Sequence, residues 1–380
     1  MGAALGGLGD TWRLIRPAHL IALIAVVLTG FGLVILGSAG HSHRSGAEIV
    51  FKKQGLWVGL ALCVFFVAAL ANLNWIRRMT WAAYGLAAVA LVLVLIPEIG
   101  IRVNGAQRWL GFDFIRVQPS ELAKVALVLG LADYLSLNQR RMRTFRFGFV
   151  VPGLVAAIPC GLIFLQPDFG TTLLFVTVAL LLMFLSGTPF RYLVPAGAIF
   201  GGAFATAVYF DPVRWERITS FLNVAAHRDD GAWQLWQGLL AFAAGGWDGV
   251  GLGNGRQQLA FLPEAHTDFI FPIIGEELGL WFTGGVLLLF LAIFAAGVRT
   301  LTQSRNLYTF NVAAGALFFL TLQALVNIGV ATGSLPTKGL SLPFISYGGS
   351  NLITMFCFVG LLCNCQRANS GPTLERRRDL

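Results

Sequence analysis

The sequence predicts an all-α integral membrane protein with about ten transmembrane helices and one large structured extracytoplasmic loop before the eighth helix. Hydrophobic residues make up 56% of the 380 residues and charged residues only 12%, whereas soluble domains carry roughly 25% charged residues. The mean hydropathy is +0.73. Long apolar runs recur along the chain, and a helix that spans a bilayer needs roughly 17–25 such residues. The expected spans lie near residues 19–38, 55–72, 78–97, 120–136, 149–165, 170–186, 190–210, 268–298, 307–331 and 344–365.

The first apolar run has a cleaved signal peptide as its alternative, since Arg13 and Arg16 precede it. Its apolar core is longer than the roughly 7–15 residues of a signal peptide, which favours a retained helix. The Gly-Ser-Ala-Gly stretch at 37–40 is the one feature that favours cleavage. We therefore expect a transmembrane helix here.

The orientation follows from the short loops on one side of the predicted bundle, which are rich in arginine. These residues are Arg77, Arg78, Arg140, Arg141, Arg143, Arg146, Arg191, Arg299, Arg305, Arg367 and Arg376–Arg378. Short basic loops stay in the cytoplasm, so both termini are expected there. The net charge of +9 is interpreted as this topology signal and as contact with anionic membrane lipids. The basic runs are short and lack interleaved aromatic residues, so no nucleic-acid partner is expected.

Residues 1–380 are predicted to form a single membrane domain, and the longest break between spans runs over about 211–267. A loop of this length in a compact domain is usually functional or disordered. Four tryptophans argue against disorder and for packing at the bilayer surface. They are Trp215, Trp233, Trp236 and Trp247. A glycine-rich stretch at 245–255 adds turns, so we expect a structured loop that lies against the membrane.

The end of this loop carries a cluster of ionisable residues, Glu264, His266 and Asp268. Asp268 alone is explained by capping of the next helix, because aspartate is favoured at that place. Capping does not explain its two neighbours, nor Glu276 and Glu277 inside the apolar run. Ionisable groups within a membrane are costly and indicate function by default. The alternative for the two glutamates is the first turn of a helix opened by a proline, where the helix dipole favours acids.

A second group of candidate residues lies around the start of the fourth span. Arg108 and Arg116 fall in an outer loop, and Glu121 and Lys124 follow on one face of the helix. One interpretation is a self-neutralising ion pair needed for packing, because an unpaired charge there is expensive. The other is the polar wall of a substrate cavity, with Lys124 near an anion. Both interpretations remain open from the sequence.

Two further stretches fall at outer loop–membrane junctions. Gln166 and Asp168 occupy a very short loop whose Pro-Asp-Phe-Gly sequence is typical of a turn. Lys338 lies in the last outer loop, and Ser346 and Tyr347 precede a Gly-Gly-Ser that enters the last span. Glycines and hydroxyls there favour either close helix packing or close approach of backbone to a phosphate.

All four groups are predicted on the same, outer side of the membrane. A carboxylate that acts as a base and cations that bind a diphosphate are then both available there. These groups suit an amphiphilic substrate with a polar head outside and a lipid tail in the bilayer. The sequence contains no P-loop, GxGxxG or HExxH motif that indicates another chemistry.

At these residues the sequence resembles the SEDS family of bacterial peptidoglycan polymerases. The resemblance covers essentially the whole chain and rests on NGAQRWLG, QPSELAK, QPDFGT, GNGRQQLAFLPEAHTDFIFPIIGEELG and LPTKGLSLPFISYGGS. The PEAHTD and PTKGLSLPFISYGG stretches are more similar to the FtsW (division) branch than to the RodA (elongation) branch.

The resemblance implies a ten-helix fold in the bacterial inner membrane with the active site on the periplasmic side. It implies glycosyltransferase activity on Lipid II, the undecaprenyl-diphosphate disaccharide-pentapeptide. The catalytic acid of the family's His-Thr-Asp-Phe motif falls on Asp268, its charged pair on Glu121 and Lys124, and its loop arginine on Arg108. It also implies a class B penicillin-binding protein, a transpeptidase, as partner, and regulators of the divisome.

Two departures accompany the resemblance. Ala260 stands where FtsW-type sequences often have a glutamate, so the protein either lacks that acid or uses Glu264. The N-terminus is shorter than in many FtsW chains.

The mechanism expected is inverting glycosyl transfer, with Asp268 as general base and cations at the leaving diphosphate. The candidate cations are Arg108, Lys124, Arg256 and Lys338. His266 is expected either to hydrogen-bond Asp268 or the sugar, or to be structural. No cofactor is certain, no metal ligands are assigned, and a divalent cation such as Mg²⁺ or Mn²⁺ is an alternative source of positive charge. The alternative functions are a flippase for the same lipid and a non-catalytic scaffold for the transpeptidase.

Overall fold

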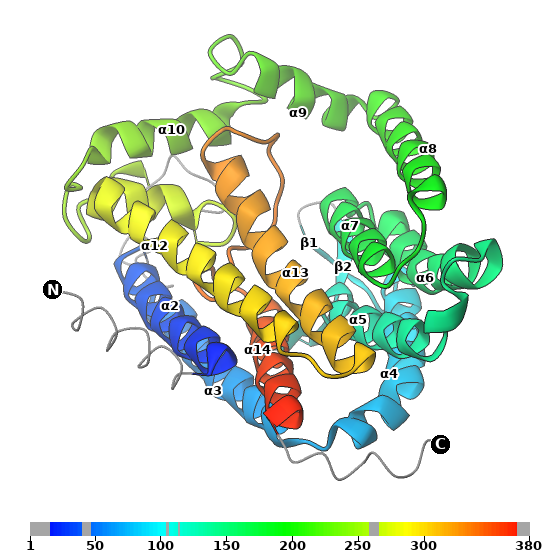
Figure 1. Ribbon diagram of the computed structural model, residues 1–380. Coiled ribbons are helices and arrows are strands. Elements are labelled where there is room, and N and C mark those ends of the chain that lie inside the picture. Colours follow the sequence, from blue (N-terminus) through cyan, green and yellow to red (C-terminus); the bar gives the residue numbers. More distant parts are fainter. Residues whose placement is uncertain (1–15, 40–46, 104–105, 113–114, 258–265, 371–380) are drawn as a thin grey trace, which may run out of the picture.

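The computed structural model describes residues 16–39, 47–103, 106–112, 115–257 and 266–370, which form a bundle of long helices (Figure 1). Each of the ten expected spans corresponds to a helix. These are α2 (Pro17–Ala39), α3 (Ala47–Leu70), α4 (Leu73–Leu95), α5 (Pro119–Leu137), α6 (Val151–Leu165), α7 (Phe169–Leu185), α8 (Phe190–Tyr209), α12 (Ile270–Thr302), α13 (Leu307–Ala331) and α14 (Gly349–Ser370). The predicted all-α membrane fold is confirmed.

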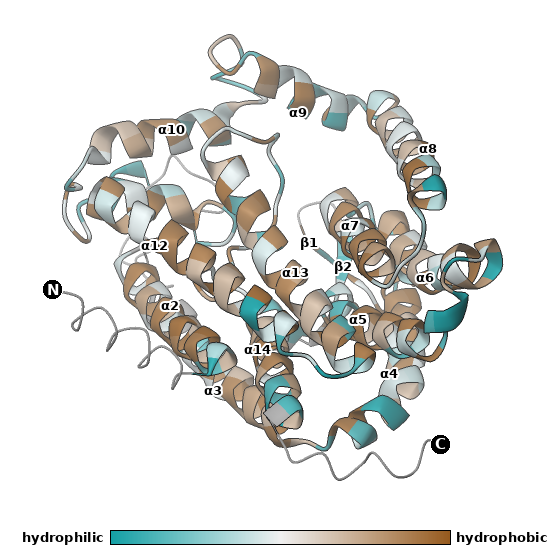
Figure 2. Cartoon of the chain, viewed as in Figure 1, coloured by the Kyte–Doolittle hydropathy of each residue, from teal (hydrophilic) through white to brown (hydrophobic). Residues whose placement is uncertain are grey.

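Eight helices in the described part of the chain are long and apolar enough to cross a bilayer. The other two are α7, which has 17 residues, and α5, which carries Glu121, Lys124 and Asp133 within 19 residues. Most side chains of α5 are buried among neighbouring helices, which is where charged residues of a membrane helix find partners. Figure 2 shows hydrophobic residues along the long helices and hydrophilic residues gathered mainly at helix ends and in connections.

Successive long helices run in opposite directions, so the bundle has two ends. At one end Arg77, near the start of α4, donates a hydrogen bond to Asp133, near the end of α5, at 2.6 Å. At the other end the backbone N–H of Gln118, before α5, donates to Ser350 Oγ, at the start of α14, at 3.1 Å. We call these the Asp133 end and the Asp268 end.

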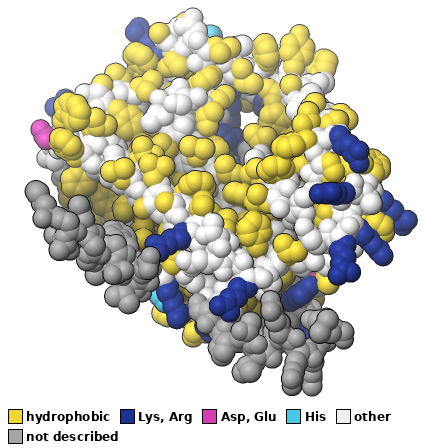
Figure 3. All heavy atoms as spheres, viewed as in Figure 1, with side chains coloured by type: hydrophobic (Ala, Val, Ile, Leu, Met, Phe, Trp, Pro, Cys, Tyr) yellow, Lys and Arg dark blue, Asp and Glu magenta, His cyan; other side chains and the backbone are white. Residues whose placement is uncertain are grey.

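The connection between α5 and α6 lies at the Asp133 end and contains two short helical segments. A 3₁₀-helix spans Gln139–Arg141, and a π-helix over Arg146–Val150 leads directly into α6. This connection carries four of the arginines that predicted the topology. Figure 3 shows Lys and Arg side chains gathered on the side of the molecule where Figure 1 places this connection.

The described part of the long break between α8 and α12, residues 210–257 and 266–269, is structured, as predicted. It contains α9 (Pro212–Leu222) and α10 (Trp233–Gly245), which form an arch from α8 across to α12 (Figure 1). Asp211 caps α9 by accepting a hydrogen bond from the backbone N–H of Arg214 at 3.2 Å. Where α10 ends, Gly245 packs so closely on Gly275 of α12 that a Cβ would overlap its carbonyl. The arch is therefore fixed to the bundle through α12.

A small sheet between α4 and α5 was not predicted. Its strands are β1 (Ile101–Val103), β2 (Ala106–Phe112) and β3 (Ile115–Val117), antiparallel in that order. Strands β1 and β3 have only three residues each, too few for a periodic signal, and the sequence suggested only a loop. The sheet lies at the Asp268 end and carries Arg108 on β2.

Candidate active site

The segment 266–269 is a turn that places Asp268 directly before α12. Phe269, not Asp268, occupies the cap position, and it makes no side-chain capping hydrogen bond. Asp268 thus lies one residue before the cap position of α12. The carbonyl of Asp268 accepts a hydrogen bond from Asn327 Nδ2 at 2.9 Å, and the carbonyl of His266 accepts one from the Tyr347 N–H at 2.8 Å. The backbone on both sides of the carboxylate is thus fixed.

The Asp268 carboxylate lies against Gly339, the residue after Lys338. A Cβ at Gly339 would stand 2.5 Å from Asp268 Oδ2, so a side chain there would displace the carboxylate. Residues 71 positions apart in the chain are thereby placed next to each other. Asp268 and Lys338, which the sequence analysis proposed for one site, therefore lie on neighbouring segments.

Asp168 is shared by two cations at this end of the bundle. Its Oδ2 lies 3.6 Å from Arg108 Nη1, and its Oδ1 lies 3.6 Å from Lys338 Nζ. Arg108 also donates to the carbonyls of Gln166 at 3.2 Å and Pro167 at 2.7 Å. The turn predicted at this loop is confirmed, and Asp168 caps α7 through the Thr171 N–H at 3.3 Å. Its contact with both cations was not predicted.

The pKa values of this group follow from burial and from the neighbouring charges. Burial alone would raise the pKa of Asp168, but Lys338, Arg108 and the hydrogen bonds from Thr171 outweigh it and bring the pKa below its usual range. Burial lowers the pKa of Lys338, Asp168 opposes that shift, and Arg108 and Arg217 lower it further. Asp168 is therefore ionised at neutral pH, and its charge helps to keep Lys338 protonated.

Further arginines on α9 extend the positive charge around this group. Arg214 stacks on Phe169, with its guanidinium carbon 3.5 Å from the ring centroid, and pairs with Asp211 at 3.1 Å. Arg217 is exposed on the same helix. Figure 3 shows a hollow between α13, α8 and α9 with Lys and Arg side chains inside it. An anion that enters this hollow meets a positive field.

The ion pair of α5 is buried behind this group. Lys124 Nζ donates to Glu121 Oε1 at 2.7 Å and to Gln323 Oε1 at 2.7 Å, and Lys124 has no exposed surface. These contacts fit the self-neutralising alternative better than a substrate-cavity wall. Direct substrate contact by Glu121 and Lys124 stays a prediction that the described geometry does not support.

The two glutamates of α12 hold the glycine-rich turn that follows α10. Glu276 Oε1 accepts from the backbone N–H of Arg256 at 2.8 Å, and Glu277 Oε1 accepts from that of Gly253 at 3.0 Å. The alternative that placed them in the first turn of a helix opened by a proline is wrong, because α12 begins at Ile270. Their partners in these bonds are backbone amides of the glycine-rich turn. These hydrogen bonds therefore fix the start of the stretch that leads toward Asp268.

In the described part of the chain, the remaining residues that the sequence analysis proposed for the site are not shown in contact with Asp168, Arg108 or Lys338. Arg256 is exposed, and Glu264 and Ala260 lie outside the described residues. Ser346 Oγ accepts a hydrogen bond from the Leu342 N–H at 2.8 Å and closes a local turn. Gly349 packs on the ring of Trp57 so closely that a Cβ would overlap it, which supports close helix packing for the stretch after Tyr347.

Metal ligation finds no support in the described part of the chain, where no group of three or more His, Cys, Asp or Glu has suitable spacing. The oxygens of Asp168 already face Arg108, Lys338 and Thr171. A divalent cation at this site stays a prediction.

Sequence reasoning missed Gln323 and Asn327, two buried residues of α13 that connect these segments. Gln323 Nε2 donates to the Ser341 carbonyl at 2.8 Å, and Asn327 Nδ2 donates to the Leu340 carbonyl at 2.6 Å. The signal was present, because two amides one helical turn apart are unusual in an apolar membrane helix.

These features define a polytopic membrane protein with a carboxylate and a cation-rich hollow at one end of its helix bundle. The chain belongs to the family of cell cycle proteins that comprises FtsW, RodA and SpoVE, whose model matches residues 18–371. It is 41% identical over 359 residues to a probable peptidoglycan glycosyltransferase FtsW of Halorhodospira halophila, covering 91% of this chain and 90% of that protein. It is 37% identical to stage V sporulation protein E of Bacillus subtilis, covering 94% of this chain and 99% of that protein.

Solved structures with the same fold include a peptidoglycan synthase complex described as coordinating polymerization and crosslinking. That chain is 26% identical, with a TM-score of 0.78 and coverage of 93% of this chain and 98% of that chain. The rod shape determining protein RodA of Thermus thermophilus is also 26% identical, with a TM-score of 0.69 and coverage of 93% and 97%.

Proposed function

We propose that this chain is a peptidoglycan glycosyltransferase that polymerises Lipid II in cell division. The observation that carries the proposal is the placement of the Asp268 carboxylate against Gly339, next to Lys338 in the group that Asp168 links to Arg108. The segments that carry a base and the cations for a leaving diphosphate are thereby neighbours. The relatives named FtsW, such as the one 41% identical, support the division role over elongation.

In this proposal the GlcNAc 4-hydroxyl of one Lipid II attacks the MurNAc anomeric carbon of the growing chain. The new bond joins that oxygen to the anomeric carbon, and the bond from this carbon to the diphosphate oxygen breaks. Asp268 accepts the hydroxyl proton, a role that typically contributes about 10²–10⁴-fold. Lys338 and Arg108 stabilise the negative charge on the undecaprenyl diphosphate that leaves. Attack opposite the leaving group converts the α-linked donor into a β-linked glycan.

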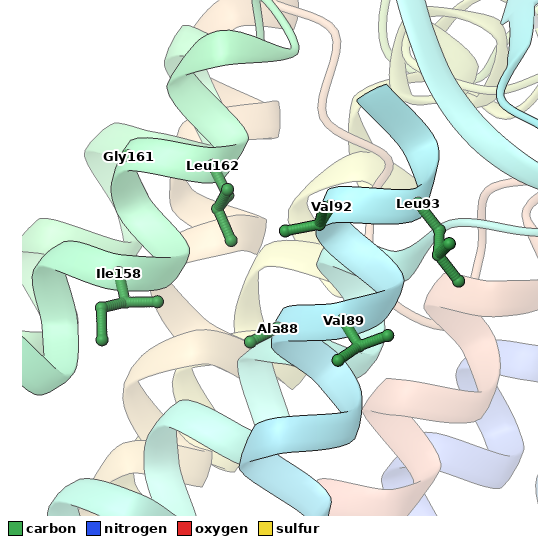
Figure 4. A pocket seen from close by; sticks show the side chains of 7 residues that line it. All are labelled: Ala88, Val89, Val92, Leu93, Ile158, Gly161 and Leu162. Carbon is green, nitrogen blue, oxygen red and sulfur yellow. The ribbon is translucent and has the colours of Figure 1, made fainter. Parts of the chain in front are cut away.

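The lipid tails of the substrates need apolar surface beside this group. An apolar hollow of about 570 Å³ lies between α4 and α6, and Figure 4 shows side chains of both helices along it. A second hollow of about 390 Å³ lies on the other side of α6, toward α7 and α8. Gly161 borders both hollows. Helix α6, which borders both hollows, ends just before Gln166 and Pro167, whose carbonyls Arg108 contacts.

The same proposal assigns the orientation and the partners. The Asp268 end faces the periplasm, and the arginine-rich Asp133 end and both termini face the cytoplasm of a bacterial inner membrane. A class B penicillin-binding protein crosslinks the glycan made here, and divisome regulators control the pair. The solved synthase complex with a TM-score of 0.78 supports such a partner.

The test is glycan synthesis by the purified chain together with its transpeptidase partner, with labelled Lipid II as substrate. We expect Asp268→Ala and the isosteric Asp268→Asn to lower the rate by about 10²–10⁴-fold. A variant that makes glycan at the wild-type rate would remove Asp268 from this role. If the wild type makes no glycan but moves labelled lipid across liposomes, the chain is a flippase. If it does neither and only recruits the transpeptidase, it is a scaffold.

A further inference from the structure

Helix α13 places two buried amide side chains, Gln323 and Asn327, on one face at the Asp268 end, and we call them the α13 amide pair. Gln323 is fully buried and Asn327 is 1% exposed. They are four residues apart, so they lie one above the other on the helix. A buried amide in a membrane helix is costly unless it is hydrogen-bonded. The hydrogen-bond partners of the pair therefore indicate its role.

Asn327 joins two segments that are distant in the chain. Its Nδ2 donates to the carbonyl of Asp268 at 2.9 Å and to the carbonyl of Leu340 at 2.6 Å. One segment carries the proposed base and the other carries Lys338 and Gly339. A single NH₂ group therefore sets the separation of the two segments.

The geometry of Asn327 requires a donor at this position. The opposite amide orientation would place Oδ1 against two carbonyl oxygens, which repel it. Oδ1 itself is buried and has no hydrogen-bond partner among the described residues. Asn327 donates two hydrogen bonds while the described residues leave its own acceptor oxygen unsatisfied, which is costly in a buried position. We conclude that the two donated bonds are required.

Gln323 holds the next carbonyl of the same segment. Its Nε2 donates to the carbonyl of Ser341 at 2.8 Å, and its Oε1 accepts from Lys124 Nζ at 2.7 Å. Lys124 is fixed in turn by Glu121 at 2.7 Å. The ion pair of α5 thus orients the amide of Gln323. The Nε2 group of this amide then holds the segment that contains Lys338 by its bond to the Ser341 carbonyl.

We propose that Gln323 and Asn327 are positioning residues that hold the Asp268 segment against the Lys338 segment, and that Glu121 and Lys124 act through Gln323 without touching substrate. This inference rests on the proposed function and adds the device that sets the base–cation spacing. A misplacement of about 1 Å at a reacting group costs on the order of 10²-fold in rate. The pair therefore acts on the rate of the chemical step more than on substrate affinity.

The first experiment removes the donor of Asn327 in the full-length chain with its partner. Asn327→Asp keeps the shape and loses the NH₂ group, and Asn327→Leu loses all polarity. We expect kcat to fall about 10–100-fold while KM for Lipid II stays within about twofold, since a positioning loss is felt in the transition state. The rates are normalised to folded protein measured by a thermal-unfolding transition.

Asn311 is the matched control, because it is a fully buried asparagine of the same helix. It lies toward the Asp133 end and its Oδ1 accepts from Ser186 Oγ at 3.1 Å. Asn311→Leu is expected to lower the unfolding temperature while kcat per folded molecule stays at the wild-type value. If the Asn327 variants fold and keep wild-type kcat, or lose kcat no more than Asn311→Leu, the proposal is overturned.

The second experiment is a double-mutant cycle between Lys124→Met and Gln323→Leu. If Lys124 acts through Gln323, the double variant loses no more kcat than the worse single variant. Additive losses would show an independent role for Lys124, such as substrate contact, and would overturn that part of the proposal. Asp268→Ala is measured in parallel. A wild type without activity contradicts the proposed function, whereas an active wild type with unaffected Asn327 and Gln323 variants contradicts this inference alone.

Discussion

The two ends of the bundle differ in how many cations surround a buried acid and at what distance. At the Asp133 end, Asp133 pairs with Arg77 at 2.6 Å and accepts from Trp81 Nε1 at 3.0 Å, so one acid has one cation at hydrogen-bonding distance. At the Asp268 end, Asp168 lies 3.6 Å from each of two cations, Arg108 and Lys338. Cations there outnumber the acid they share, and neither contact is at the distance of a good charged hydrogen bond.

This difference separates a structural charge pair from a binding group. A fully paired charge has no capacity left for a ligand, whereas two loosely held cations around one acid retain positive charge for an anion. The surrounding surfaces agree, because the hollow with basic side chains lies beside α13, α8 and α9 (Figure 3). Equivalent substitutions at the two ends should therefore have opposite consequences for activity and stability.

The largest contrast is expected from removing one cation at each end. Lys338→Gln removes charge that stabilises the leaving diphosphate, and we expect kcat to fall about 10²–10³-fold. Arg77→Gln leaves Asp133 without its cation, so the free energy of unfolding should fall by about 1–3 kcal/mol. Glycan synthesis per folded molecule and denaturant unfolding measure the two effects. If folded Arg77→Gln lost activity, the distinction between a structural Asp133 end and an anion-binding Asp268 end would be contradicted.

A smaller contrast is expected from adding one methyl group at each end. A Cβ at Gly170 would overlap the side chain of Lys338, and a Cβ at Gly148 would overlap the carbonyl of Met142. The lysine side chain is able to move, so Gly170→Ala should misplace it and lower kcat about 10-fold or more. The backbone carbonyl is not free to move, so Gly148→Ala should cost about 1–3 kcal/mol of stability. Unfolding and activity assays measure the two effects. If Gly170→Ala lost only stability and Gly148→Ala lost only activity, the result would count against the role of Lys338.

The smallest change at neutral pH is expected from Asp168→Asn, which leaves both cations in place. Its effect near pH 7 should be less than about tenfold, or about 1.4 kcal/mol. The pH profile is more informative, because burial lowers the pKa of Lys338 and Asp168 opposes that shift. Removing Asp168 lowers this pKa further, and the charged lysine is the active form. Activity should therefore disappear at a lower pH than in the wild type as pH rises.

Asp211→Asn is the control for that profile, since Asp211 pairs with Arg214 at 3.1 Å and is not among the groups that shift the pKa of Lys338. Its alkaline limb should coincide with that of the wild type. An Asp168→Asn profile that is unchanged, or displaced to higher pH, would contradict the electrostatic role of Asp168.

Hydropathy and short motifs predicted much of the molecule, because a bilayer imposes long apolar helices on any chain that spans it. The ten helices follow from that constraint, and the positions of Asp268, Arg108 and Lys338 at one end follow from counting the spans. The sheet that carries Arg108 was missed, since the two strands that pair with β2 have only three residues each. Local spacing likewise could not distinguish an internal ion pair at Glu121 and Lys124 from a cavity wall.

By itself the sequence determined which residues form the long membrane helices, which are charged and at which end each lies, since those depend on runs of neighbouring residues. Only the tertiary structure decided that Asp168 faces two cations, that Gly339 receives the Asp268 carboxylate and that Asn327 joins both segments. These contacts join residues tens to more than a hundred positions apart. Their separation is set by how α5, α7 and α13 pack, and no local pattern encodes that packing.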